Sequence, residues 1–188
     1  MTDALDLVTR AGWAATQATT PETAVNHAMR LLWERLGDRS AHLQPGALDP
    51  GQAQFFVGGA FFVTPDLRHQ MLTGNIGFPP EQRRLLIPID GGHPGQVIAT
   101  GAPLLLEDTR KHPAFKQYLT SARMSSAIYA PLIWDGAARG LIILAAQAGG
   151  TMGPQDLAIL CAIAPAITAN WLRLGGPDWL AVEYSGLG

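Results

Sequence analysis

Residues 95–144 decide the fold of this chain: GQVIATGAPLLLEDTRKHPAF (95–115), a variable segment, and SSAIYAPLIWDGAARGLIIL (125–144). The order of apolar runs, glycines and turn residues predicts a short helix, a buried strand, a turn, a second helix start and a two-strand hairpin. The markers are a helix end at Gly101, a strand at 103–106, a turn at Asp108-Thr109, a helix start at His112-Pro113 and a hairpin turn at Asp135-Gly136.

Towards the N-terminus, the pattern predicts a helix over 5–15 and a stronger amphipathic helix over 21–36. Thr20 and Pro21 form an N-cap followed by proline at the first helical position. Residues 38–53 contain two Pro-Gly pairs, and we expect an inserted loop with at most one short strand. Strands are expected at 54–63, 69–73 and 85–89. The paired glycines Gly58-Gly59 favour a bulge or a break in the first of these strands.

Beyond residue 146, the sequence predicts one long helix and an apolar tail. Gly153-Pro154 opens an amphipathic stretch of about five turns. Pro165 inside it removes a backbone hydrogen bond and is expected to kink the helix. The tail at 175–188 is rich in apolar residues, and we expect it to pack on the domain or on a partner subunit.

Composition excludes several classes of protein. The 188 residues are 47% apolar and 15% charged, which is typical of one folded globular domain with extensions. A net charge of −2 without a run of Lys or Arg argues against a nucleic-acid partner. The longest apolar runs fall short of the roughly 20 residues of a membrane helix, and the N-terminus lacks a secretion signal. With a single cysteine, we expect a cytoplasmic protein without a membrane segment.

The order of motifs between 91 and 144 resembles the second half of a GAF domain, and the resemblance extends over about 21–173. It implies an α/β (α+β), PAS-related fold with a six-stranded, mostly antiparallel sheet. Terminal helices would cover one face, and short roof helices and loops the other. Residues 1–20 would form an N-terminal helix, 21–174 the GAF domain and 175–188 the tail. Many members hold a small molecule under the roof.

Carried onto this chain, the resemblance places a pocket between the helix at 95–100, the segment 108–118 and the strand at 125–131. A mostly apolar cavity with a few placed polar groups is typical of ligand sites. The candidate ligand-binding residues are His93, Asp108, Thr109, Phe115, Tyr118, Ser126 and Tyr129.

Each candidate also has a purely structural interpretation. Asp108 and Thr109 can serve as turn or N-cap residues. His93 can cap a backbone group at a helix start, and Phe115 and Tyr118 can pack within the roof.

The sequence does not decide which face of the strand at 125–131 lines the pocket. Alternation places Ser126 and Ile128 on one face and Ser125, Ala127 and Tyr129 on the other. Only one of these sets can face the pocket.

Specialised members of the family differ from this chain at the residues that define them. The Asn-Lys…Phe…Asp-Glu pattern of the phosphodiesterase type is absent. Bilin-binding members attach their chromophore through a cysteine, and free methionine sulfoxide reductases need a nucleophilic and a resolving cysteine. Cys161 stands alone on the predicted C-terminal helix, where it resembles a small buried residue. The histidines lack metal-ligand spacing. We therefore expect no catalytic residue, no metal and no cofactor.

The leading hypothesis is a stand-alone GAF sensor that binds a small-molecule effector of unknown identity. It would signal through a helix-mediated homodimer or to a separate output protein. One alternative is a ligand-free structural or interaction module, and another is an enzyme with an unrecognised site. A bulky residue at Ser126 or Tyr129 would separate the first two hypotheses, because only a sensor should lose a ligand-dependent thermal shift.

Overall fold

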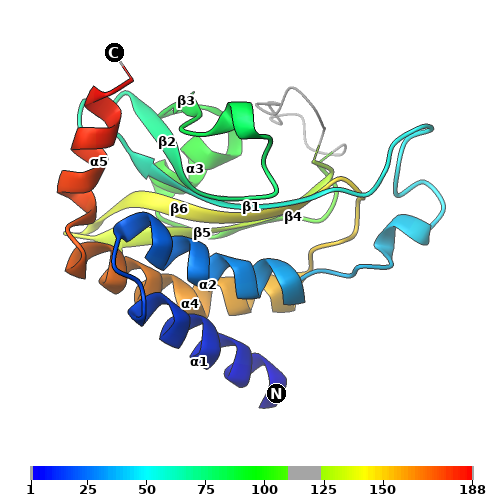
Figure 1. The fold of residues 1–188 in the computed structure, drawn as a ribbon. Helices are drawn as coiled ribbons and strands as arrows, with labels where there is room; N and C mark the ends of the chain where they lie inside the picture. Colours follow the sequence, from blue (N-terminus) through cyan, green and yellow to red (C-terminus); the bar gives the residue numbers. More distant parts are fainter. Residues whose placement is uncertain (1, 110–123, 188) are drawn as a thin grey trace.

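The computed structural model describes residues 2–109 and 124–187. Within them, six strands form one sheet in the order β3-β2-β1-β6-β5-β4, with every neighbouring pair antiparallel (Figure 1). The expected six-stranded sheet of an α+β fold is therefore confirmed. The strands are β1 (Phe56–Val63), β2 (His69–Ile76), β3 (Leu86–Pro88), β4 (Leu104–Leu106), β5 (Ser126–Trp134) and β6 (Ala137–Ala146).

The helices form layers on both faces of this sheet (Figure 1). α2 (Pro21–Arg35) and α4 (Pro154–Arg173) cover one face, and α1 (Thr2–Thr16) packs outside them. α3 (Gly92–Thr100) covers the other face, and α5 (Gly176–Ser185) lies at one end of the sheet. By length and composition α4 could cross a membrane, but its position between the sheet and α1 accounts for its apolar sequence.

The second helix begins and ends where the sequence predicts. The Thr23 amide donates to the Thr20 hydroxyl at 3.2 Å, and the Thr20 amide donates to the Thr23 hydroxyl at the same distance. This reciprocal pair satisfies donors that a helix start leaves open. Pro21 occupies the first turn, and Gly37 leaves the helix in the left-handed region at φ +82°.

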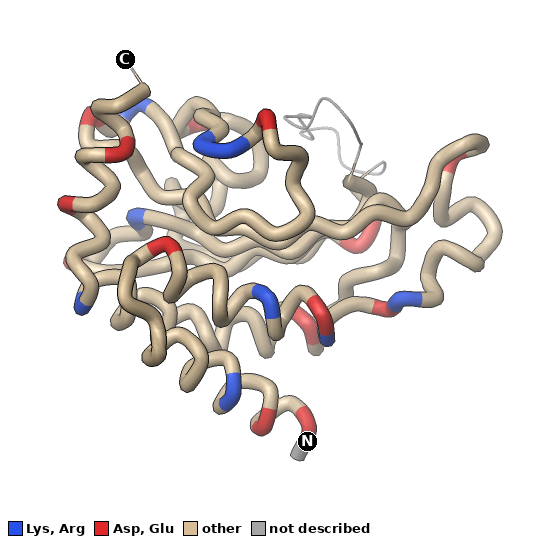
Figure 2. The backbone as a smooth tube through the Cα atoms, in the orientation of Figure 1, with Lys and Arg blue, Asp and Glu red and all other residues tan. Residues whose placement is uncertain are grey.

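Alternation along the strands divides the apolar residues into two cores. On the helical face, Phe62 of β1 stacks on the fully buried Trp171 of α4, with ring centroids 3.7 Å apart. On the α3 face, Phe61, Leu72 and Val97 are buried together. Among the described strands, Arg139 is the one charged residue, and Figure 2 shows charges confined mainly to helices and turns. The sheet is therefore apolar on both faces.

Of the bulge and the break expected at the paired glycines of β1, the structure shows no break, but a register shift lies close to them. β1 pairs with β6 without interruption from Phe56 to Phe62. The register shift occurs against β2, after Ala60, where β2 contributes one extra residue. The glycines serve close packing. A Cβ at Gly58 would lie 2.8 Å from the Leu144 side chain, and one at Gly59 would lie 2.9 Å from the Gly74 carbonyl oxygen.

The segment 38–53 is a loop with a single 3-10 turn at Ala41–Leu43, and it extends beyond the sheet (Figure 1). Its ends are tied to the connection between β6 and α4. The Asp38 amide donates to the Thr151 carbonyl at 2.8 Å, and the Gly149 amide donates to the Ala47 carbonyl at 3.0 Å. The base of the loop is thus part of the domain.

The C-terminal tail forms α5 and packs on the domain, the first of the two expected possibilities. Gly175, at φ +74°, reverses the chain after α4, and Pro177 lies in the first turn of the new helix. Trp179 meets Trp171 edge to face at 5.7 Å. The Tyr184 hydroxyl donates to Asp66 at 2.8 Å in the turn between β1 and β2. Aromatic packing and hydrogen bonds therefore hold both ends of α5.

The Asp66 carboxylate should give this attachment a measurable pH dependence. A hydrogen bond from the Thr64 hydroxyl, together with those from the Arg68 amide and Tyr184, lowers the pKa of Asp66 from 3.8 to about 2. Because the folded state lowers this pKa, the stabilisation is complete above about 3.8 and is lost as the pH falls through about 2.

Replacing Asp66 by Asn should therefore lower Tm at pH 7, and the difference from the wild type should shrink between pH 4 and pH 2. Thermal unfolding monitored by circular dichroism across that range measures it. Glu34→Gln, at an exposed carboxylate on α2, is the matched control and should leave Tm unchanged. A deficit for Asp66→Asn that stays constant with pH would contradict the assignment.

Candidate ligand-binding site on the α3 face of the sheet

Two of the residues singled out in the sequence meet on the α3 face. Tyr129 lies in β5, opposite Leu104 of β4 and Ile143 of β6, and belongs to the apolar core of this face. His93 lies in the first turn of α3 and is 4% exposed. Their ring centroids are 6.5 Å apart, with the ring planes tilted by 45°. A histidine and a phenol therefore lie together within an apolar enclosure.

The start of α3 is held tightly against the chain that precedes it. A Cβ at Gly95 would lie 2.3 Å from the carbonyl carbon of Asp90, so glycine is required for this approach. At the other end, Gly101 closes the helix in the left-handed region at φ +63°, and its amide donates to the Val97 carbonyl. These two glycines fix α3, and with it His93, over the sheet.

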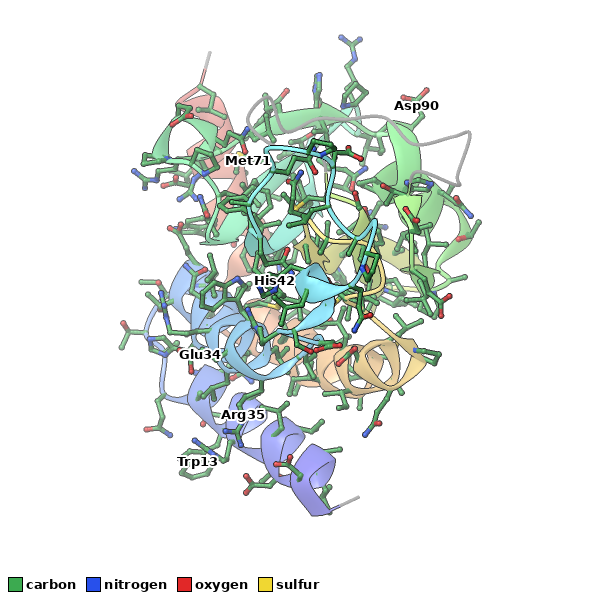
Figure 3. All side chains as sticks on the ribbon, turned by 90° about the vertical axis from the view of Figure 1, so that its right-hand side faces the viewer. Trp13, Glu34, Arg35, His42, Met71 and Asp90 are labelled. Carbon is green, nitrogen blue, oxygen red and sulfur yellow. The ribbon has the colours of Figure 1, made fainter. Side chains whose placement is uncertain are left out.

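A depression of about 660 Å³ runs along α3. The sequence analysis placed His93 there but missed Asp90 and Gln96, which also line it. Figure 3 shows Asp90 at the outer edge of this region. Gln96 follows His93 by three positions, so helical periodicity alone could have placed the two on one side of α3. The depression combines these polar groups with the apolar side chains of Ile89, Ile98 and Ala99.

The Tyr129 side chain lies in the apolar core of this face. Burial raises the pKa of Tyr129, so the phenol stays neutral and retains its proton at physiological pH. A neutral phenol both donates and accepts, so it can bind either a carbonyl or an N–H group of a ligand.

Thr109 and Asp108 lie at the junction that follows β4. Thr109 is fully buried; its amide donates to the Ser125 carbonyl at 2.6 Å and its hydroxyl to the Met124 carbonyl at 2.8 Å. The Thr109 hydroxyl proton is therefore already used in a hydrogen bond to the backbone. This geometry matches the turn interpretation of Thr109, while Asp108 beside it is partly exposed.

Ser126 lies on the opposite face of the sheet from Tyr129, which corrects its place among the candidates. Its hydroxyl donates to the Leu106 carbonyl at 3.3 Å and accepts from the Met152 amide at 2.9 Å. Its same-face neighbour Ile128 belongs to the core under α2 and α4. Ser126 therefore joins β4, β5 and the start of α4. The two remaining candidates, Phe115 and Tyr118, lie outside the described residues.

The structure also shows where the side chains that could bind a metal or act as a thiol nucleophile lie. No cluster of three or more His, Cys, Asp or Glu side chains occurs in the described part of the chain. Cys161 lies on α4, half-buried beside the helical core, on the other side of the sheet from Tyr129. Burial raises the pKa of its thiol, which disfavours the nucleophilic thiolate.

The model of the GAF domain family matches residues 20–170. The chain belongs to the GAF domain family. A search of curated protein sequences found no significant match. Among solved structures, the GAF domain of a phosphoenolpyruvate-protein phosphotransferase from Coxiella burnetii superposes with a TM-score of 0.75 at 17% identity. That alignment covers 94% of this chain and 96% of the other.

Two further GAF structures show how varied the relatives of this fold are. Free methionine-R-sulfoxide reductase from Neisseria meningitidis, in complex with its substrate, has a TM-score of 0.72 at 17% identity, covering 92% of this chain and 90% of its own. A putative GAF sensor protein from Burkholderia vietnamiensis has a TM-score of 0.70 at 16% identity, covering 92% and 96%. At such identities the likeness shows the shared fold, which serves both an enzyme and a sensor.

Proposed function

We propose that this GAF domain is a sensor that binds a small-molecule effector between α3 and the sheet. The observation that carries the proposal is the buried Tyr129 side chain beside the buried His93 in an otherwise apolar core. Ligand sites combine apolar walls with a few convergent polar groups, and this face has both. The hydroxyl would fix the orientation of the ligand, and the apolar walls would supply most of the affinity.

Binding accounts for the residues of this site better than reduction of methionine sulfoxide does. Sulfoxide reduction by thiols needs a thiolate at the substrate and a second thiol to resolve the intermediate. This chain has one cysteine. Cys161 lies on α4, away from Tyr129, and burial raises its pKa. We therefore assign the chain to effector binding and not to catalysis.

Signalling requires an interface through which occupancy of the site reaches a partner. We assign this role to α1, through which the domain would form a homodimer or meet a separate output protein. An apolar groove of about 490 Å³ runs between α1, α2 and α4, lined by Val8, Gly12, Trp13, Leu31 and Ile163. Trp13 is 69% exposed, and Figure 3 shows its indole pointing away from the body of the molecule. Within the cytoplasm, the unpaired thiol of Cys161 would stay reduced.

Replacing Trp13 by Glu should convert the dimer into a monomer, because a carboxylate at the centre of an apolar contact loses its hydration. Sedimentation velocity at micromolar protein measures the change. Leu43→Glu is the matched control, since Leu43 is 73% exposed and lies on the 38–53 loop. If both variants dissociate equally, or if the wild type is already a monomer, α1 is not the dimer interface.

Native and denaturing mass spectrometry of freshly purified protein tests ligand binding. We expect a native mass above a whole number of chains, with the excess released as one small molecule on denaturation. The released molecule then becomes the probe for a matched pair of variants, Tyr129→Phe and Tyr184→Phe. Both lose a phenolic oxygen, but Tyr184 lies on α5, away from the site.

Tyr129→Phe should bind the released molecule about tenfold more weakly, as expected for one lost hydrogen bond in a buried site. Tyr184→Phe should retain wild-type affinity, and calorimetric titration compares the two. Unchanged affinity in Tyr129→Phe would exclude the proposed role of the hydroxyl. A native mass without any bound molecule would favour the ligand-free interaction module instead.

A further inference from the structure

A second cleft, of about 460 Å³, opens between α2 and the connection from β2 to β3. It is separate from the α3 site because α2 covers the opposite face of the sheet. Its polar lining comes from Asn26, Arg30 and Trp33 of α2, together with Asn75 and Arg83 beyond it. Phe78 adds an apolar wall.

The side-chain oxygens of the two asparagines at this cleft accept hydrogen bonds from the backbone. The Asn75 backbone amide donates to Asn26 Oδ1 at 2.9 Å, and the Phe78 amide donates to Asn75 Oδ1 at 3.2 Å. Because a backbone N–H can only donate, these contacts fix the orientation of both side-chain amides. The oxygens are used within the protein, and the Nδ2 groups remain for a ligand.

The carboxylate that lines this cleft is paired with a buried arginine. Glu22 accepts two hydrogen bonds from Arg84, one at each oxygen and both at 2.8 Å. Arg84, whose side chain is 6% exposed, also donates to Glu183 at 2.8 Å, so the three side chains together carry one net negative charge. With the two exposed arginines Arg30 and Arg83, the charged side chains at and behind the cleft sum to one net positive charge.

Two guanidinium groups supply positive charge without an internal partner. Arg30 and Arg83 are exposed, and no ion pair within residues 2–109 and 124–187 involves either of them. Both line the cleft, one from α2 and the other from the end of the 3-10 turn Pro80–Gln82. Trp33, in the same wall, has a buried Nε1 donor for which the described residues provide no acceptor.

We propose that this cleft binds a small organic or inorganic oxyanion, a carboxylate or a phosphate, between Arg30 and Arg83. The two exposed cations at the cleft outweigh its net negative charge, and guanidinium groups match the planar oxygen pairs of carboxylate and phosphate. The amide Nδ2 atoms of Asn26 and Asn75 supply the further hydrogen bonds. The cleft is thus a second binding site, independent of the effector site under α3.

Titration of ¹⁵N-labelled protein with sodium phosphate, and separately with sodium succinate, tests this proposal. Sodium chloride keeps the ionic strength constant, because exposed charges are otherwise screened to different extents. We expect saturable shifts of the Asn26 and Asn75 side-chain amides and of the Arg30 and Arg83 Nε–H signals. Saturation with phosphate alone would identify a phosphate site, and saturation with succinate alone a carboxylate site.

The double variant Arg30→Gln/Arg83→Gln should lower the affinity for the more tightly bound of the two anions by about tenfold or more. This loss is expected when charge-assisted hydrogen bonds are removed. Arg68→Gln, at an exposed arginine between β1 and β2, is the matched control and should bind like the wild type. Linear, non-saturating shifts with both anions, or equal losses in all variants, would overturn the proposal. Matching circular dichroism spectra confirm that each variant is folded.

Discussion

Replacing Trp171 by Ala is expected to lower the free energy of unfolding by about 4 kcal/mol. The indole is fully buried and stacks on Phe62 at 3.7 Å, while Trp179 meets its edge at 5.7 Å. Gly176 lies directly against the same ring, since a Cβ there would lie 2.2 Å from it. Neighbours fixed on three sides cannot collapse into the cavity, so the loss should lie at the upper end of the range for aromatic truncation.

Urea denaturation followed by far-ultraviolet circular dichroism measures this loss. Trp13→Ala is the control, because that tryptophan is 69% exposed on α1 and its truncation should cost well under about 1 kcal/mol in the isolated protomer. The comparison is made at low protein concentration, so that self-association does not contribute. A similar midpoint for Trp171→Ala and the wild type would mean that α4 does not pack on β1 as described.

Replacing Arg84 by Met should cost about 3 kcal/mol, because it leaves two carboxylates without their cation. Arg84 donates to Glu22 of α2 and to Glu183 of α5 at 2.8 Å, and its guanidinium lies 4.9 Å from the centroid of Trp179. Burial alone would lower the pKa of Arg84, but hydrogen bonds and charge from both carboxylates outweigh it and raise the pKa. The side chain thus connects two helices to the edge of the sheet.

The adjacent Arg83 provides the control for this substitution. It is exposed and forms no ion pair within the described chain, so Arg83→Met should leave the unfolding midpoint within about 0.5 kcal/mol of the wild type. Hydrogen exchange should also show α5 opening first in Arg84→Met, because Glu183 and Trp179 both lose their contact with the guanidinium. Equal stability of the two variants would show that the buried network contributes nothing.

Local signals in the sequence were sufficient for most helices and hairpins. Thr20 and Pro21 predict the start of α2 through a cap that forms between neighbours in the chain. Asp135-Gly136 predicts the hairpin between β5 and β6, since both residues adopt positive φ there. Such features depend on a few adjacent residues, and the sequence displays those directly.

The features that could not be predicted from the sequence depend on contacts between distant parts of the chain. Gly58 is needed because Leu144 and Trp33 lie against it, which no local pattern reveals. The pair Gly175-Gly176 marks the end of α4, but whether a further helix follows depends on packing against Trp171 and on Arg84. Helix propensity alone did not predict α5, which tertiary contacts stabilise.

The candidate site was partly predictable for the same reason. Alternation in β5 correctly places Ser126 and Tyr129 on opposite faces of the sheet. Which face each residue occupies depends on contacts between distant residues, such as the hydrogen bond from the Met152 amide to the Ser126 hydroxyl, 26 positions away. The resemblance to GAF domains supplied His93 and Tyr129. The second cleft was not foreseen, because Arg30 and Arg83 are 53 positions apart and become neighbours only in the folded chain.

The loop at 38–53 has a practical consequence for testing the proposed sensor function. The loop is hydrogen-bonded at Asp38 and Ala47 to the connection that leads into α4, while a Cβ added at Gly51 would meet open space. A circularly permuted fluorescent protein inserted between Asp49 and Gly51 would therefore leave the cores intact. Any movement of α4 on binding of the proposed effector would reach the chromophore through the anchored loop, and the fusion would then report binding optically.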